Sequence, residues 1–97
     1  MPKQTQVFEN NSGADMLVDM EMSPDRYVLR QGEAMEISYE HEGDGPGLRV
    51  NIHPRGLQIF LDDFYSAIVT IDGVVRKPWT GLTPEQQHFP WAVPPAS

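Results

Sequence analysis

Alternation of apolar and polar residues over positions 48–61 constrains the fold of this chain more than any other feature. Apolar side chains take every second position on both sides of Pro54-Arg55-Gly56, namely Leu48, Val50, Ile52, Leu57, Ile59 and Leu61. Because successive side chains of a strand point to opposite faces, the pattern predicts two β-strands joined by a tight turn. Two strands cannot bury their apolar faces alone, so the rest of the chain must supply a second layer.

Shorter segments repeat the alternation between turn residues, which predicts further strands over residues 6–9, 16–22, 26–30, 34–40, 66–71 and 74–77. Asn10-Asn11-Ser12-Gly13 indicates a turn rather than a glycosylation site. Asp72-Gly73 between two β-branched runs predicts a type I′ hairpin turn, because both central residues need positive φ. Residues 16–22 are expected to form a half-buried strand whose core-facing side chains are Met16, Val18, Met20 and Met22.

The last twenty residues have a different chemistry, since residues 78–97 hold five of the nine prolines. Thr83-Pro84-Glu85-Gln86 matches a capping box with proline at the first helical position, and predicts a short helical turn near residues 84–89. We therefore expect a β-sandwich domain over 1–77 and a proline- and aromatic-rich C-terminal tail over 78–97 that packs on the same domain.

Short strands separated by regular turn signals predict an all-β fold: an antiparallel β-sandwich, immunoglobulin-like or jelly-roll-like, with seven to eight strands. The stretch from Met16 to Ile37, with a break at Pro24 and a turn at Gly32-Glu33, resembles the opening of many bacterial immunoglobulin-like domains. The resemblance covers about a quarter of the chain. It implies the sandwich architecture and assigns no functional residue; the cysteine and tryptophan hallmarks of true immunoglobulin domains are missing.

Composition excludes several classes of function. The 97 residues are enough for one domain with a modest core, and the absence of cysteine removes disulfides, zinc–thiolate sites and thiol nucleophiles. The net charge of −7 opposes binding to nucleic acid or to anionic membranes. Residues 1–44 carry ten of the fourteen acids, which either keep the surface solvated or dock a basic partner. Without an apolar leader, we expect a cytoplasmic protein.

No group of residues predicts a catalytic site, a metal site or a cofactor. His53 ends one strand of the opening hairpin and Asp62-Asp63 follow the other, so the hairpin separates these groups by a strand length. His41 and its acidic neighbours Glu42 and Asp44 are expected in a solvated loop. The methionines of residues 16–22 either form the apolar face of a strand or offer thioether ligands to Cu(I).

Three aromatic residues of the tail, Trp79, Phe89 and Trp91, are the candidate partner-binding residues. Large aromatic side chains are enriched at binding hot spots, although they also suit a tail that folds back over an open end of the sandwich. The leading hypothesis is a small non-catalytic interaction or assembly module that acts through a protein partner or self-association, using edge strands and the tail. The alternative is a β-sandwich that binds a metal or small ligand; an enzyme ranks third.

Overall fold

The structure is a computed structural model that describes residues 3–21, 25–45, 47–62 and 67–89. Within these ranges lie eight strands and one short helix. In chain order they are β1 (Lys3–Glu9), β2 (Met16–Met20), β3 (Asp25–Leu29), β4 (Ala34–Glu40), β5 (Leu48–His53), β6 (Gly56–Leu61), β7 (Ile68–Ile71), β8 (Val74–Val75) and α1 (Pro84–Gln87).

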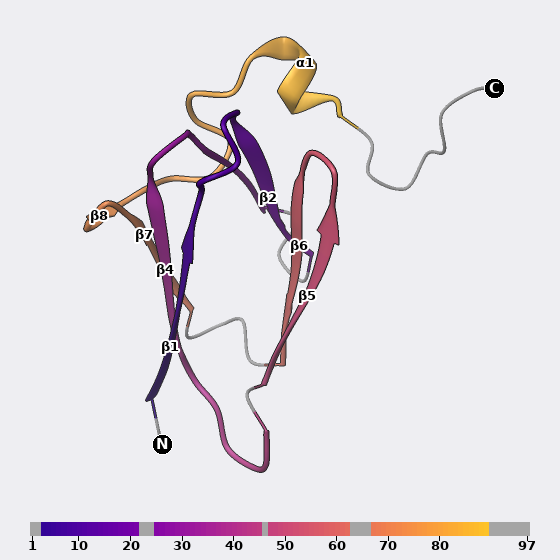
Figure 1. Cartoon of the computed structure of the whole chain (residues 1–97). Helices are drawn as coiled ribbons and strands as arrows, with labels where there is room; N and C mark the ends of the chain where they lie inside the picture. The colour runs from indigo at the N-terminus through magenta and orange to yellow at the C-terminus, as the bar shows by residue number, and fades with distance from the viewer. Residues whose placement is uncertain (1–2, 22–24, 46, 63–66, 90–97) are drawn as a thin grey trace, which may run out of the picture.

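Two four-stranded sheets face each other (Figure 1). The first, here called sheet I, has the order β1-β4-β7-β8, and the second, sheet II, has the order β3-β2-β6-β5. The pairs within sheet I and the pairs β2–β3 and β5–β6 are antiparallel, whereas β2 and β6 run parallel. The predicted all-β, mainly antiparallel sandwich is therefore confirmed.

Local turn chemistry explains the features that the sequence predicted. In the hairpin of β5 and β6, His53 lies opposite Gly56 and Leu48 opposite Leu61. Asp72 and Gly73, which join β7 and β8, have φ values of 52° and 83°, as a type I′ turn requires. Thr83 caps α1 with its side chain, and Gln86 completes the capping box.

The turn after β1 is held by the buried side chain of Asn10. Its amide nitrogen donates to the carbonyl oxygens of Ala14 at 2.8 Å and Leu29 at 2.7 Å, and its Oδ1 accepts from the backbone amide of Ser12. The side-chain amide of Asn10 is therefore hydrogen-bonded within the protein, in agreement with the prediction of a turn.

The core lies between the sheets and draws on both. Its buried members are Val18, Met20, Tyr27, Leu29, Met35, Ile37, Tyr39, Ile59, Leu61, Val69 and Ile71. Met20 lies among them, which supports the apolar-face interpretation of the methionine stripe over a copper site; Met22 lies outside the described residues. Burial also raises the pKa of the Tyr27 phenol to about 12, with a smaller contribution from the carboxylate of Asp25.

The prediction of a half-buried strand over residues 16–22 is wrong for β2. Leu17 and Asp19 point away from the core, yet their exposed fractions are only 3% and 9%. Arg26 and Val28, which lie opposite them on β3, are also buried. The chain that follows β8 crosses to sheet II (Figure 1), where Trp79 and Gln86 contact Arg26, so β2 is buried on both sides. Among the described residues, no helix has the length and apolarity needed to cross a membrane.

Candidate interaction surfaces

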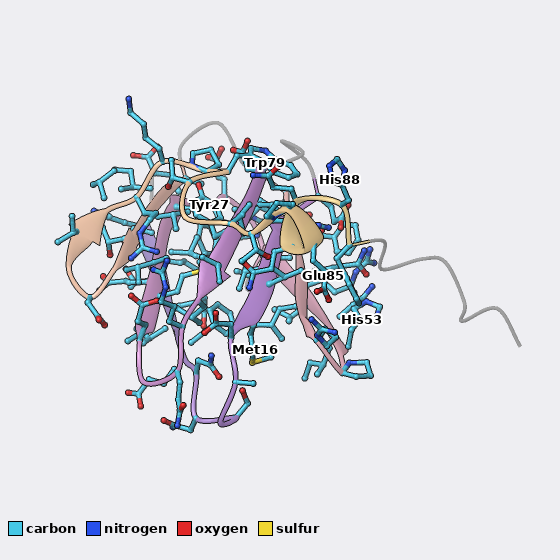
Figure 2. The ribbon with its side chains drawn as sticks, turned by 90° about the horizontal axis from the view of Figure 1, so that it is seen from above. Met16, Tyr27, His53, Trp79, Glu85 and His88 are labelled. Carbon is cyan, nitrogen blue, oxygen red and sulfur yellow. The ribbon has the colours of Figure 1, made fainter. Side chains whose placement is uncertain are left out.

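The β2–β3 part of the outer face of sheet II is covered by the described part of the tail. The backbone amide of Trp79 donates to the carbonyl oxygen of Arg26 at 2.7 Å, which attaches the tail to β3. Trp79 adopts a positive φ of 65°, unusual for a bulky residue, where the chain bends over the sheet. Beyond it, Nη2 of Arg30 approaches the carbonyl oxygen of Gly81 at 3.4 Å. In the view of Figure 2, the tail segment that carries Trp79 and Glu85 crosses the strands.

A buried ion pair fixes the tail to this face. Nε and Nη2 of Arg26 donate to the two carboxylate oxygens of Asp19 at 2.6 and 2.7 Å. The third nitrogen, Nη1, donates to the carbonyl oxygen of Gln86 in α1 at 2.6 Å. The guanidinium carbon lies 5.6 Å from the ring centroid of Trp79, within cation–π range. One arginine therefore joins β2, β3, the helix and an aromatic ring of the tail.

A second and more exposed contact continues along the tail. The guanidinium of Arg55, in the β5–β6 turn, lies 4.9 Å from the ring centroid of Phe89 and 3.6 Å from a carboxylate oxygen of Glu85. Two of the three predicted partner-binding aromatics, Trp79 and Phe89, therefore each face an arginine of the same domain. Trp91 lies outside the described residues, so the fold-back of the whole tail and any contact with a partner stay predictions.

Three polar side chains form a chain across the outer face of β2, β6 and β5. Nε2 of His53 is 2.5 Å from Oε1 of Gln58, whose amide donates to Glu21 at 2.8 Å. Asp62 follows the opposite end of β6, as the hairpin predicts, and Asp63 lies outside the described residues. Within the described ranges, no three histidine or carboxylate side chains are grouped so that they could hold a metal ion.

The prediction of a solvated loop after β4 is wrong for His41. Its exposed fraction is only 9%, because Gly47 lies directly against the imidazole ring. A Cβ at position 47 would lie 2.5 Å from Nδ1 of His41. The ring nitrogen Nε2 is 3.4 Å from the carbonyl oxygen of Asp44. Glu42 and Asp44 themselves are exposed, so His41 packs the loop while its acidic neighbours remain in solvent.

Two hollows border these elements. The larger, of about 480 Å³, is open and lined by Asp44, Gly47, Leu48, Arg49, Phe60, Leu61 and Asp62. The smaller, of about 170 Å³, is lined by Asp19, Met20, Glu21, Asp25 and Trp79. In the smaller hollow the carboxylates of Asp19 and Glu21 already accept hydrogen bonds from Arg26 and Gln58. Neither lining combines a nucleophile, a base and an oxyanion donor in the way that a hydrolytic site requires.

The outer face of sheet I is open, in contrast to that of sheet II. Residues directly opposite in a sheet share a face, so Val7, Glu36, Thr70 and Val75 form one row across it. Ile68 lies in the next row, opposite Ser38. The apolar members Val7, Ile68 and Val75 are exposed to 57%, 52% and 70%. No other described element lies over this face (Figure 1).

The two sheets also differ in their edges. Carbonyl oxygens of the β3 edge accept hydrogen bonds from the chain after β8: that of Arg26 from the Trp79 amide, and that of Val28 from Arg76 at 3.4 Å. β8 spans only two residues. β1 is a seven-residue edge strand in which no residue is buried. Sequence reasoning anticipated edge strands and the aromatic tail, but missed the covering of the β3 edge and the Asp19–Arg26 pair. The opposite charges flanking Pro24 were the available signal for that pair.

Comparison of the chain with protein-family models, with curated proteins and with solved structures found no match to any of them.

Proposed function

We propose that this protein is a small non-catalytic interaction module that binds protein through the open side of sheet I. The observation that carries the proposal is the asymmetry of the sandwich. Its own chain covers the outer face of β2 and β3 in sheet II, whereas the outer face of sheet I exposes Val7, Ile68 and Val75. Apolar side chains gathered on one exposed face are typical of interaction sites in small domains.

The chemistry of this face also indicates the class of partner. One row across the strands holds Thr5, Ser38 and Ile68, and the next holds Val7, Glu36, Thr70 and Val75, so β-branched and hydroxyl side chains surround a single carboxylate. Thr5 and Ser38 place their hydroxyl oxygens 3.3 Å apart, so the row combines short polar side chains with the apolar Ile68 on an uncovered sheet. Such a surface suits another sheet or an extended segment better than a small molecule, which needs a concave site.

Substitution of one exposed residue in each sheet tests this assignment. Ile68→Asp places a charge on the open face, and the matched control Ile52→Asp changes a residue of β5 that is 80% exposed. A C-terminally tagged chain is recovered from its native cells, and co-purifying proteins are quantified by mass spectrometry. We expect proteins retained by the wild type and by Ile52→Asp to fall about tenfold with Ile68→Asp. Equal retention by the two variants, or no specific retention by the wild type, would contradict the proposal.

The cysteine-free composition is compatible with a reducing compartment, and we propose the cytoplasm as the site of this interaction. Fractionation of cells that express the tagged chain tests that location, and recovery in a secreted fraction would contradict it.

A further inference from the structure

We infer that the partner of the open β1 edge is the β1 strand of a second copy of this chain, so that two sandwiches join into one continuous sheet. This inference goes beyond the proposed function, because it concerns the β1 edge of sheet I and not the outer face, on which Ile68 of β7 lies two strands away. It follows from three features of β1: the direction of its backbone groups, the order of its side chains, and the lack of an equivalent strand at the other described edges.

The backbone of β1 presents a regular row of groups to the open edge. The amide of Asn10 donates to the carbonyl oxygen of Glu33, which continues the β1–β4 ladder. In an antiparallel ladder the bonded pairs alternate, so the even-numbered residues of β1 bond to β4. Lys3, Thr5, Val7 and Glu9 therefore direct their N–H and C=O groups away from β4, with their side chains exposed on the outer face of sheet I.

β4 independently supports this parity. The amide of Asp72 donates to the carbonyl oxygen of Ala34, so Ala34 turns its backbone groups toward β7 rather than toward Glu9. Hydrogen bonds on both sides of β4 thus agree that the odd-numbered residues of β1 direct their N–H and C=O groups to the open edge. It is the kind of edge that pairs with another strand unless charge or cover prevents it.

The side-chain order of β1 is self-complementary when the strand is reversed. The strand reads Lys-Gln-Thr-Gln-Val-Phe-Glu, and an antiparallel copy centred on Gln6 places Lys3 opposite the second copy's Glu9 at both ends. The same register places Thr5 opposite Val7, a pair of β-branched residues that suits cross-strand packing. Lys3 then lies between that Glu9 and Glu40, its neighbour on β4.

Shifted registers lose this complementarity. A shift that centres the pairing on Thr5 puts Lys3 opposite Val7, and one that centres it on Val7 puts Thr5 opposite Glu9. Only the pairing centred on Gln6 aligns all seven residues of the strand and places Lys3 opposite Glu9 at both ends. Charges at the two ends of an edge strand thus select one register, and the two-fold axis closes the assembly at a dimer.

The other edges do not offer the same match. β3 is covered by hydrogen bonds from the chain after β8, and β8 is two residues long. β5 carries Arg49 and no carboxylate, so its reversed copy brings no opposite charges together. Among the described strands, β1 alone combines an open edge, seven residues and charges of opposite sign at its ends.

Cysteine substitution in this cysteine-free chain tests the register directly. In the proposed pairing, Gln6 faces its own copy in a non-bonded pair, where Cα atoms lie about 4.5 Å apart, a separation that a disulfide spans. Gln4 lies opposite Phe8, so two copies of residue 4 are about 13 Å apart. Under mild oxidation of the full chain, tagged at its C-terminus, we expect Gln6→Cys to give a covalent dimer and the equally half-buried control Gln4→Cys to give none.

Charge reversal provides a second test, in which sedimentation equilibrium over a range of protein concentrations measures the dimer affinity. Lys3→Glu or Glu9→Lys places like charges opposite each other at both ends, so dimerisation should weaken about tenfold at low salt. The double variant Lys3→Glu/Glu9→Lys restores opposite charges across the dimer and should recover the affinity, although Lys3→Glu also opposes Glu40 within one copy.

Each outcome decides the inference. Cross-linking of Gln6→Cys with rescue by the double variant supports it. A wild type that stays monomeric at millimolar concentration, cross-linking through residue 4 rather than 6, or a double variant weaker than both single variants overturns it. A monomer that still retains another protein in an Ile68-dependent way would overturn self-pairing while the proposed function stands. If the dimer forms regardless of Ile68→Asp, and cells yield no protein that is retained in an Ile68-dependent way, the proposed function is overturned while self-pairing stands.

Discussion

The Asp19–Arg26 pair should be the most sensitive polar contact of the fold, and replacing Arg26 with methionine tests this. The side chains of the two residues are exposed to only 13% and 8%. Arg26→Met keeps much of the apolar stem but deprives the buried Asp19 carboxylate of its two hydrogen bonds from Arg26. Removing one member of a buried ion pair costs about 3–5 kcal/mol. The variant also loses the hydrogen bond to Gln86 that fixes α1.

The double variant Asp19→Leu/Arg26→Met separates the loss of the pair from the burial of a lone charge. Replacing both members with apolar residues of similar size is often close to neutral, so the double variant should lose only about 1–2 kcal/mol, mainly from the released helix. The double variant should therefore be about 2–3 kcal/mol more stable than Arg26→Met alone, so the two substitutions are not additive.

Urea unfolding followed by tryptophan fluorescence and far-UV circular dichroism measures these differences. With a slope of about 2 kcal/mol per molar urea for a domain of this size, the midpoint of Arg26→Met should fall by about 2 M. Protein concentration is held constant and low, so that self-association does not contribute. A loss below about 1 kcal/mol for Arg26→Met, or a double variant less stable than the single one, would refute the reasoning.

Three further predictions concern other parts of the fold. Burial raises the pKa of Tyr27 to about 12, so the native protein binds this proton more tightly than the unfolded chain does. Stability should therefore fall as pH rises above 10 toward 12, and Tyr27→Phe should remove that part of the pH dependence in unfolding experiments; an unchanged profile would contradict it. Gly47→Ala should destabilise the fold by about 2–3 kcal/mol, because it combines a positive φ with a clash against His41. The control Gly45→Ala also has a positive φ but open space around it, and should cost only about 1 kcal/mol. Equal losses of the two variants in thermal unfolding would exclude the clash. Thr83→Ala should cost about 1 kcal/mol and speed amide exchange in α1 more than in the sheets, and uniform exchange would show that the cap does not act locally.

Much of the fold followed from short-range patterns. The hairpin of β5 and β6, the Asp72-Gly73 turn and the cap at Thr83 each depend on residues close together in the chain, which fix φ or satisfy a nearby amide. Strand lengths were less accurate, since the predicted strand over residues 6–9 begins at Lys3 in the structure. Extra residues at a strand end depend on a partner strand that supplies hydrogen bonds.

The candidate surfaces were only partly visible in the sequence. Trp79 and Phe89 stood out as large apolar groups in a proline-rich tail, but the sequence did not indicate that Arg26 and Arg55 face their rings. It also did not indicate which face of β2 would be covered, because alternation reports polarity and not the position of a distant segment. Alternation alone predicts that Asp19 faces solvent. Its burial depends on Arg26 of β3 and on the tail that covers both residues.

Short-range patterns in the sequence predict the strands, their apolar faces and the tight turns, and composition excludes cysteine chemistry. Long-range packing decides that β2 and β6 run parallel, that the tail covers β2 and β3 through a contact such as that of Arg26 with Gln86, sixty positions apart, and that no other described strand pairs with the outer edge of β1. The physical reason is that local patterns act between neighbours along the chain. Covering a face or an edge depends on which distant segments reach it, and only their packing together settles that.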